Sequence, residues 1–127
     1  KHLKYFGERV LTYLDQDVNI RFDIETVSNF RKGDHTSSRQ SYRYGKLINI
    51  SDGDIIEVIE RSIEELTIAL MQNKLNVEEA FVLKDAYSDL NIVAVIESGR
   101  DEFTLKIITV MRKENFRERD GQFVLEI

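Results

Sequence analysis

The strongest constraint on the fold is a capped amphipathic pattern that begins at Ser51. Ser51 and Asp54 have the spacing of a capping box, with Asp in place of the more usual Glu. Apolar side chains then recur every three or four residues, at Ile55, Ile59, Ile63, Leu66 and Leu70. The pattern predicts a long helix over residues 52–73 whose apolar face packs under the rest of the fold. Its other face carries Glu57, Glu60, Glu64 and Glu65, which is typical of a solvated surface, with a metal site as the alternative.

After Asn76 the pattern changes to one that is typical of β-strands. Short segments rich in β-branched and aromatic residues occupy 81–83, 90–97, 103–111 and 122–127. The connections between them are short, which favours hairpins and therefore an antiparallel meander of four strands. Both alternating sets of residues in 103–111 are partly apolar, so this strand is expected to be central. The last segment, 122–127, is a candidate edge strand that could recruit a partner or form a homo-oligomer.

Two further elements are expected before Ser51. Leu3, Phe6, Val10 and Leu14 are spaced as on one face of a helix, which predicts a first helix over 2–15. Residues 18–24 alternate between apolar and polar and predict a half-buried strand. The expected fold class is therefore α+β, with two or more helices packed on a four-stranded antiparallel meander. Residues 1–127 would form a single two-layer domain, helical over 1–75 and a sheet over 77–127.

The composition excludes several classes of function. The chain of 127 residues has no Cys, which removes disulfides, thiolate catalysis and Cys-ligated metals. Its histidines are His2 and His35, so a multi-histidine metal site is also excluded, and no cofactor or metal is expected. No apolar run approaches the length of a membrane helix and no signal peptide is recognisable, so a cytoplasmic protein without a membrane partner is expected.

A positively charged segment stands out in this acidic chain. Residues 31–46 hold five basic side chains and one acidic side chain, whereas the whole chain has a net charge of −5. Within it, His35, Arg39 and Arg43 would share one face if the segment were helical. An imidazole can transfer a proton near neutral pH, and guanidinium groups can hold a phosphate. These groups are what metal-free cleavage of RNA requires, although an exposed polar loop is the simpler interpretation.

Other residues could extend such a site. Tyr42 could stack on a base, and Thr109 on the central strand could face the substrate, although packing and strand formation explain both residues equally well. Six basic side chains in the segment, or on or beside predicted strands, could contact phosphates: Arg31, Lys32, Lys46, Lys84, Lys106 and Arg112. For any one of them a plain surface role is the alternative.

The order of these features resembles a known superfamily. The chain has a predicted helix, then the spacing His35-x-x-x-Arg39-x-x-x-Arg43, then a capped helix, and then a meander whose central strand reads Leu105-Lys-Ile-Ile-Thr109-Val110-Met111. This order looks like the barnase–EndoU–colicin–RelE group of ribonucleases and ribonuclease toxins. The resemblance covers residues 30–127. It implies that His35 is the general acid/base, that Arg39 and Arg43 bind the phosphate, and that Thr109 is a polar residue on the catalytic sheet face. The implied product is a 2′,3′-cyclic phosphate, formed without a metal.

Three hypotheses follow. The first is a metal-independent endoribonuclease, toxin-like or phage-type, with His35, Arg39, Arg43 and Thr109 as catalytic residues. The second is a non-catalytic module that uses the basic 31–46 segment to hold RNA or an acidic protein such as an inhibitor or antitoxin. The third is an assembly module that forms an oligomer through the long helix and an edge strand.

Overall fold

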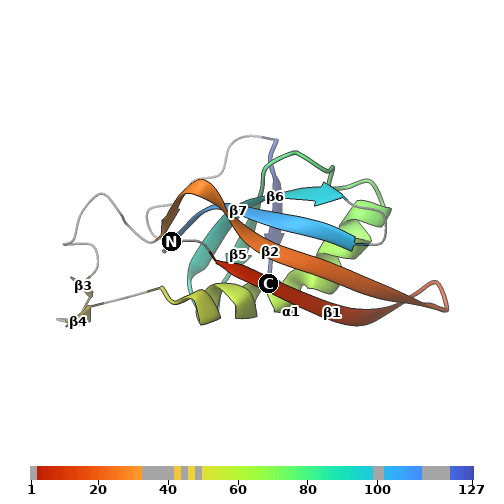
Figure 1. Ribbon diagram of the computed structural model, residues 1–127, viewed down its shortest axis with the longest axis horizontal. Helices are drawn as coiled ribbons and strands as arrows, with labels where there is room; N and C mark the ends of the chain where they lie inside the picture. Colours follow the sequence, from red (N-terminus) through yellow and green to blue (C-terminus); the bar gives the residue numbers. More distant parts are fainter. Residues whose placement is uncertain (1–2, 33–41, 44–45, 48–49, 99–101, 113–120) are drawn as a thin grey trace.

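The fold is mostly β and is built around one mixed sheet. The computed structural model describes residues 3–32, 42–43, 46–47, 50–98, 102–112 and 121–127. In these residues, six strands form a sheet in the order β1-β2-β7-β6-β5-β8, and two short strands, β3 and β4, form a separate hairpin (Figure 1). The elements are β1 (Lys4–Tyr13), β2 (Gln16–Lys32), β3 (Tyr42–Arg43), β4 (Lys46–Leu47), α1 (Asp52–Met71), β5 (Phe81–Asp85), β6 (Leu90–Ser98), β7 (Glu102–Arg112) and β8 (Phe123–Glu126).

The N-terminal segment is a strand, so the predicted helix over 2–15 is wrong. β1 pairs antiparallel with β2 through a two-residue turn at Leu14 and Asp15, whose φ angles are 51° and 64°. Positive φ at both turn residues matches the twist of a tight hairpin. Along β1 the odd-numbered positions face the core, as shown by buried Leu3 and Leu11, while Phe6, Val10 and Leu14 are exposed. The buried residues of this segment therefore alternate along a strand, and the apolar residues that suggested a helix are mostly on the exposed side.

The sheet is not a four-stranded antiparallel meander, and the described residues contain one helix rather than two or more. β5, β6 and β7 do form the antiparallel part that was predicted. However, β2 pairs with β7 in parallel, and β8 pairs in parallel with β5 at the far edge. The N-terminal hairpin thus extends the sheet, and β8 is an edge strand as predicted. A parallel neighbour requires a crossover connection, which the short-connection argument did not consider.

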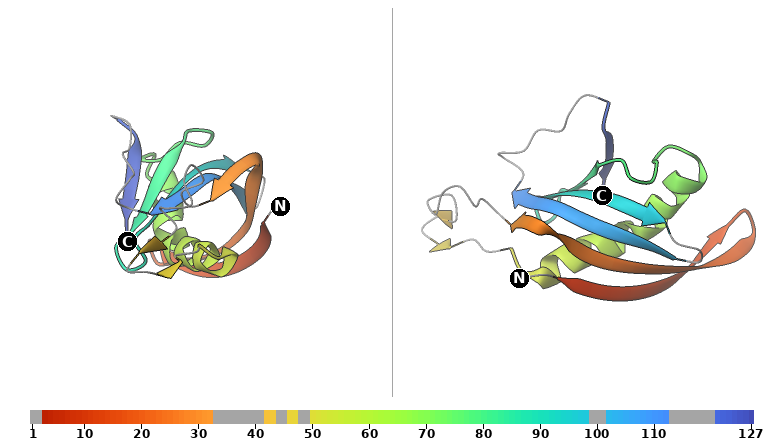
Figure 2. Two further views of the ribbon diagram at one scale, coloured as in Figure 1. Left: turned by 90° about the vertical axis from the view of Figure 1, so that its left-hand side faces the viewer. Right: turned by 45° about the horizontal axis from the view of Figure 1, so that its top comes forward.

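The helix predicted from Ser51 is confirmed. The Ser51 hydroxyl accepts from the backbone N–H of Asp54 at 3.0 Å, and the Asp54 carboxylate accepts from the backbone N–H of Ser51 at 3.3 Å. This is the capping box that the sequence indicated. The sheet curls around α1, so one face of the sheet and the apolar face of α1 enclose the core (Figure 2).

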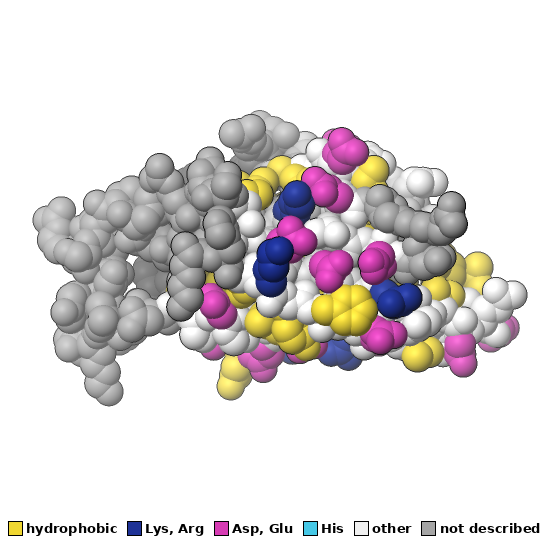
Figure 3. Space-filling model, viewed as in Figure 1, with side chains coloured by type: hydrophobic (Ala, Val, Ile, Leu, Met, Phe, Trp, Pro, Cys, Tyr) yellow, Lys and Arg dark blue, Asp and Glu magenta, His cyan; other side chains and the backbone are white. Residues whose placement is uncertain are grey.

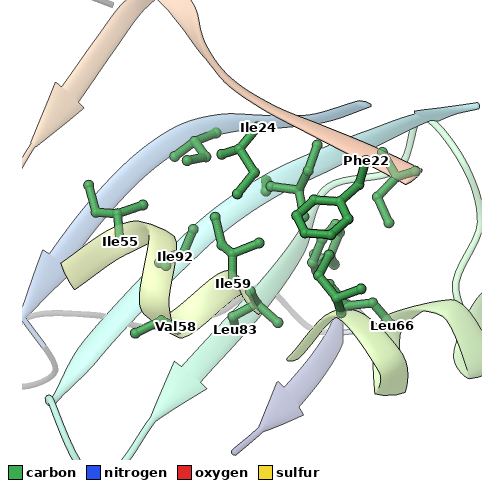
Figure 4. Close-up of a cluster of buried hydrophobic side chains, with 14 of the residues drawn as sticks. Phe22, Ile24, Ile55, Val58, Ile59, Leu66, Leu83 and Ile92 are labelled. Carbon is green, nitrogen blue, oxygen red and sulfur yellow. The ribbon is translucent and has the colours of Figure 1, made fainter. Parts of the chain in front are cut away.

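The core side chains interlock between α1 and the strands. Ile55, Ile59 and Leu66 from α1 meet Phe22 from β2 and Ile92 from β6 (Figure 4). All five are fully buried. The apolar face of α1 therefore packs under the sheet as expected. In the part of the chain that the structure describes, no helix has the length and apolarity needed to cross a membrane.

Candidate nucleic-acid interface

Four strands end at the same end of the sheet: β2, β5, β7 and β8, which is parallel to β5. β2 runs parallel to β7, and β5 is also parallel to β7 because both are antiparallel to β6. The carboxyl-terminal ends of β2, β5 and β7 therefore lie together, beside the start of β6 (Figure 2). Residues far apart in sequence reach neighbouring positions there.

Five of the residues singled out from the sequence lie at this end. Arg31 is opposite Thr109 in the β2–β7 ladder, and Lys32 follows it. Arg112 ends β7 and is opposite Leu90 of β6, which is itself opposite Asp85, the neighbour of Lys84 in β5. Adjacent strands are separated by about 4.8 Å, so the row from β2 to β5 spans about 15 Å. We call the following residues the strand-end cluster: Arg31, Lys32, Lys84, Thr109 and Arg112.

Lys84 and Thr109 are the members whose side-chain surroundings are described. Both side chains are half-buried, and both take part in interactions within the fold. Arg31, Lys32 and Arg112 are placed by their backbone register alone. The cluster is therefore defined by topology: four basic residues and one hydroxyl residue on three strands that end together.

The basic segment itself is described only in part. His35 and Arg39 lie outside the described residues. Tyr42 and Arg43 form β3, and Lys46 lies in β4, with Tyr42 opposite Leu47 and Arg43 opposite Lys46. A helix carrying His35, Arg39 and Arg43 on one face would have to continue through Arg43, which is instead in an extended strand. The expectation of one shared helical face is therefore wrong for Arg43.

Lys106 does not belong to the cluster. Its ammonium group pairs with the Glu97 carboxylate at 3.5 Å, in the middle of the sheet face turned away from α1. Glu25 is opposite Lys106 in the β2–β7 ladder. Figure 3 shows that acidic and basic side chains alternate over this face. Lys106 is thus part of a mixed-charge surface, and its predicted contact with a phosphate receives no support from its neighbours.

A small cavity adjoins Lys84. Its volume is about 170 Å³, and it lies where β5, β6 and β8 come together. The lining residues are Lys84, Asp85, Ala86, Leu90, Asn91, Glu126 and Ile127. Asn91 is 1 % exposed, and its amide nitrogen Nδ2 is buried without a hydrogen-bond partner in the part of the chain that the structure describes. The sequence analysis missed Asn91, because a polar residue that alternates with Leu90 and Ile92 reads as an ordinary outward position.

An ion pair anchors this corner of the sheet to α1. Arg61 donates from both terminal nitrogens to the Asp85 carboxylate, at 3.2 and 2.7 Å, and the Ser88 backbone N–H donates to the same carboxylate at 3.1 Å. Burial of Asp85 by itself raises its pKa, but the hydrogen bonds from Arg61 and Ser88 outweigh that effect and leave the pKa below its ordinary value. Asp85 is therefore a charged structural residue that fixes the end of β5, next to Lys84.

Most of the acidic side chains of α1 lie away from the sheet, and Glu60 is the exception. Glu57, Glu64 and Glu65 are exposed, while the buried residues of α1 face the strands. Glu60 is half-buried and accepts a hydrogen bond from the Tyr5 hydroxyl at 2.8 Å, which raises the pKa of Tyr5. Within the described ranges, no group of three or more His, Asp or Glu side chains is arranged to hold a metal ion. The acidic run is therefore a solvated helix face.

Comparison of the chain with protein-family models, with curated proteins and with solved structures gave no match. The resemblance to the barnase–EndoU–colicin–RelE group stays a prediction from the residues that carry it.

Proposed function

We propose that the strand-end cluster binds the phosphate backbone of single-stranded RNA. The observation that supports this is the register, which brings Arg31 and Lys32 of β2, Lys84 of β5 and Arg112 of β7 to one end of the sheet. Basic residues on neighbouring strands suit a polyanion, because each can neutralise one phosphate of an extended strand. The chain has a net charge of −5, so a group of basic residues at one end of the sheet favours an anionic ligand there.

Neighbouring groups favour a particular direction for the bound strand. Glu126 is opposite Lys84 on β8 and carries an exposed negative charge, so phosphates are disfavoured at the β8 edge. Asp85 contributes little repulsion, because its charge is compensated by Arg61. The backbone would therefore follow β2 and β7, on the side away from β8.

The test uses two lysines on the same sheet. Lys32→Gln removes a charge from the cluster, whereas Lys106→Gln removes the same charge from a lysine that is paired with Glu97. Binding of a fluorescent mixed-sequence RNA is measured at several salt concentrations in EDTA. We expect Lys32→Gln to weaken binding and to reduce the slope of log K against log salt by about 0.7, the value for one lost phosphate contact on a single strand. Lys106→Gln is expected to leave the slope unchanged.

Two results would refute the proposal. Absence of binding by the unmodified protein at every salt concentration would refute RNA as the ligand. Equal weakening by Lys32→Gln and Lys106→Gln would refute the strand-end cluster as the binding site, because it would indicate a diffuse charge effect.

A second candidate function is metal-independent cleavage of the bound RNA. It is favoured by the position of Arg31 opposite Thr109, because Thr109 is one of the residues proposed for catalysis and His35 is three residues after Lys32, the last residue of β2, in the sequence. In this mechanism His35 would act as general acid/base on the 2′-hydroxyl, and Arg39 and Arg43 would stabilise the charge on the phosphate. The same RNA incubated in EDTA with the unmodified protein and with His35→Ala tests it. Cyclic-phosphate ends from the unmodified protein alone would support cleavage, and intact RNA with both would leave a non-catalytic RNA-binding module.

A further inference from the structure

The cavity beside Lys84 is lined by the buried amide of Asn91, whose nitrogen has no hydrogen-bond partner among the described residues. Asn91 lies in β6, which is paired on both sides by β5 and β7, and its side chain is 1 % exposed. A buried donor without an acceptor destabilises a protein, and such groups are rare in native structures. Asn is also disfavoured in strands. Asn91 is both a buried donor without an acceptor and a poor strand former, and it still occupies a central strand. We therefore expect its amide to bind a ligand.

The size of the cavity limits what that ligand can be. A cavity of about 150 Å³ is known to hold one benzene molecule. The cavity here has a volume of about 170 Å³, so it fits a single six-membered ring better than a fused pair of rings. The lining is mixed, with Leu90 and Ala86 as apolar walls and with Lys84, Asn91 and Glu126 as polar groups.

The polar groups match the edge of a nucleobase. Asn91 Nδ2 can donate only to an acceptor such as a ring carbonyl oxygen. The Glu126 carboxylate can accept from a ring N–H or from an exocyclic amino group. Pyrimidine bases present such acceptors and donors around one six-membered ring. The cavity is separated from β7 by β6, so a base would extend across β6 from a backbone that follows β2 and β7.

We propose that this cavity, lined by Asn91, Lys84 and Glu126, binds one pyrimidine base of an RNA whose backbone lies on the strand-end cluster. The inference rests on the proposed function. It adds base selectivity to it, since the cluster alone would bind any sequence, whereas the cavity accepts a single ring. The protein is therefore expected to prefer pyrimidine-rich over purine-rich single strands.

The experiment compares the binding of two RNA octamers, oligo-U and oligo-A, by fluorescence anisotropy at physiological salt in EDTA. We expect oligo-U to bind the unmodified protein about tenfold more tightly than oligo-A. Asn91→Leu has a similar side-chain volume and no donor, and we expect it to weaken oligo-U binding about tenfold while oligo-A binding stays unchanged. Oligo-A binding thus reports that the variant is folded and that the strand-end cluster is intact. Asn76→Leu, which replaces an exposed Asn outside the cavity, serves as the matched control and is expected to change neither affinity.

Failure of the inference differs from failure of the proposed function. Equal binding of both octamers by the unmodified protein, or equal weakening of both by Asn91→Leu, would overturn the base cavity and leave backbone binding in place. Binding of neither octamer would overturn the proposed function and the inference together.

Discussion

The substitution Gly7→Ala distinguishes the observed strand from a helix by the sign of its effect on stability. Gly7 is opposite Phe22 in the β1–β2 ladder, and the Phe22 ring lies over the glycine. A Cβ added at Gly7 would lie 2.5 Å from Cζ of Phe22, which is itself fully buried and stacked against Phe103 at 6.4 Å. Such overpacking costs about 1–3 kcal/mol. The reduced freedom of the unfolded chain returns about 0.4–1 kcal/mol, so a net loss of up to about 2.5 kcal/mol is expected.

Urea unfolding followed by circular dichroism measures this loss. The control is Gly53→Ala in the first turn of α1, where the nearest atom to an added Cβ is the Ser51 hydroxyl oxygen, at an ordinary 3.7 Å. There the same substitution is expected to stabilise by up to about 1 kcal/mol, the usual advantage of Ala over Gly in a helix.

The double variant tests the contact itself. Phe22→Leu removes Cζ, so Gly7→Ala should cost at least about 1 kcal/mol less in that background than in the unmodified protein. If Gly7→Ala stabilised the protein, or if Phe22→Leu did not change its cost, the reasoning from the ring contact would be refuted. If Gly7→Ala stabilised the protein, that result would also support the helix over 2–15 that the apolar spacing predicted.

Three further predictions concern α1 and its contacts. Arg61→Met leaves the buried Asp85 carboxylate with fewer hydrogen-bond donors and should lower the free energy of unfolding by about 1–3 kcal/mol at neutral pH. The lower end of this range is expected, because the Arg61 side chain is 38 % exposed and solvent screens the ion pair. Because the folded-state pKa of Asp85 is lowered, this stabilisation is fully present above the unfolded pKa near 3.8 and is lost as the pH falls through the lower folded pKa. Urea titrations from pH 7 to pH 2 should therefore show that the stability difference between Arg61→Met and the unmodified protein vanishes at the acid end. A stability difference that is independent of pH would contradict this prediction. Ser51→Ala should cost about 1 kcal/mol in the same assay, through loss of the cap, and no loss would refute the capping box. Ile59→Ala should cost about 2–5 kcal/mol because Ile59 is fully buried, and a loss below 1 kcal/mol would mean that the core is looser than described.

The sequence predicted those elements whose signal is local. The helix after Ser51 has a cap and a regular apolar face, and both features act within a few residues of each other. The strands over 81–85, 90–98, 102–112 and 123–126 were also predicted close to their observed bounds. In both cases the apolar residues that define the pattern are also the residues that are buried in the fold, so the pattern predicts the element correctly.

The N-terminal hairpin could not be predicted in the same way. Its turn uses Leu14 and Asp15 at positive φ in place of Gly or Asn, so the usual hairpin signal is missing. Its inward positions include Gly7 and Arg9, whereas Phe6 and Val10 are exposed. Apolar spacing alone therefore favoured a helix. Gly7 in the middle of that expected helix was the one local sign against it.

Strand order is also beyond what local patterns determine. The parallel pairs β2–β7 and β5–β8 join segments that are distant in the sequence, and residue patterns report which face of a strand is buried but not which strand lies beside it. This limits what could be predicted of the site. The sequence identified basic residues one by one, and the register of the ladders is what brings Arg31, Lys84 and Arg112 to one end of the sheet.

The distance between the acidic face of α1 and the strand-end cluster bears on how an acidic chain could hold a polyanion. Exposed carboxylates such as Glu57 and Glu64 are on the helix, while the strand-end cluster is on the sheet that covers it. A helix layer and a sheet layer are about 10 Å apart, and the screening length is about 8 Å at physiological salt but about 30 Å at 0.01 M. At physiological salt the helix carboxylates are therefore largely screened from a ligand at the strand ends, whereas at very low salt they repel it. The net charge of −5 thus opposes the approach of RNA mainly under low-salt conditions, and the local arrangement of basic residues decides binding at physiological salt.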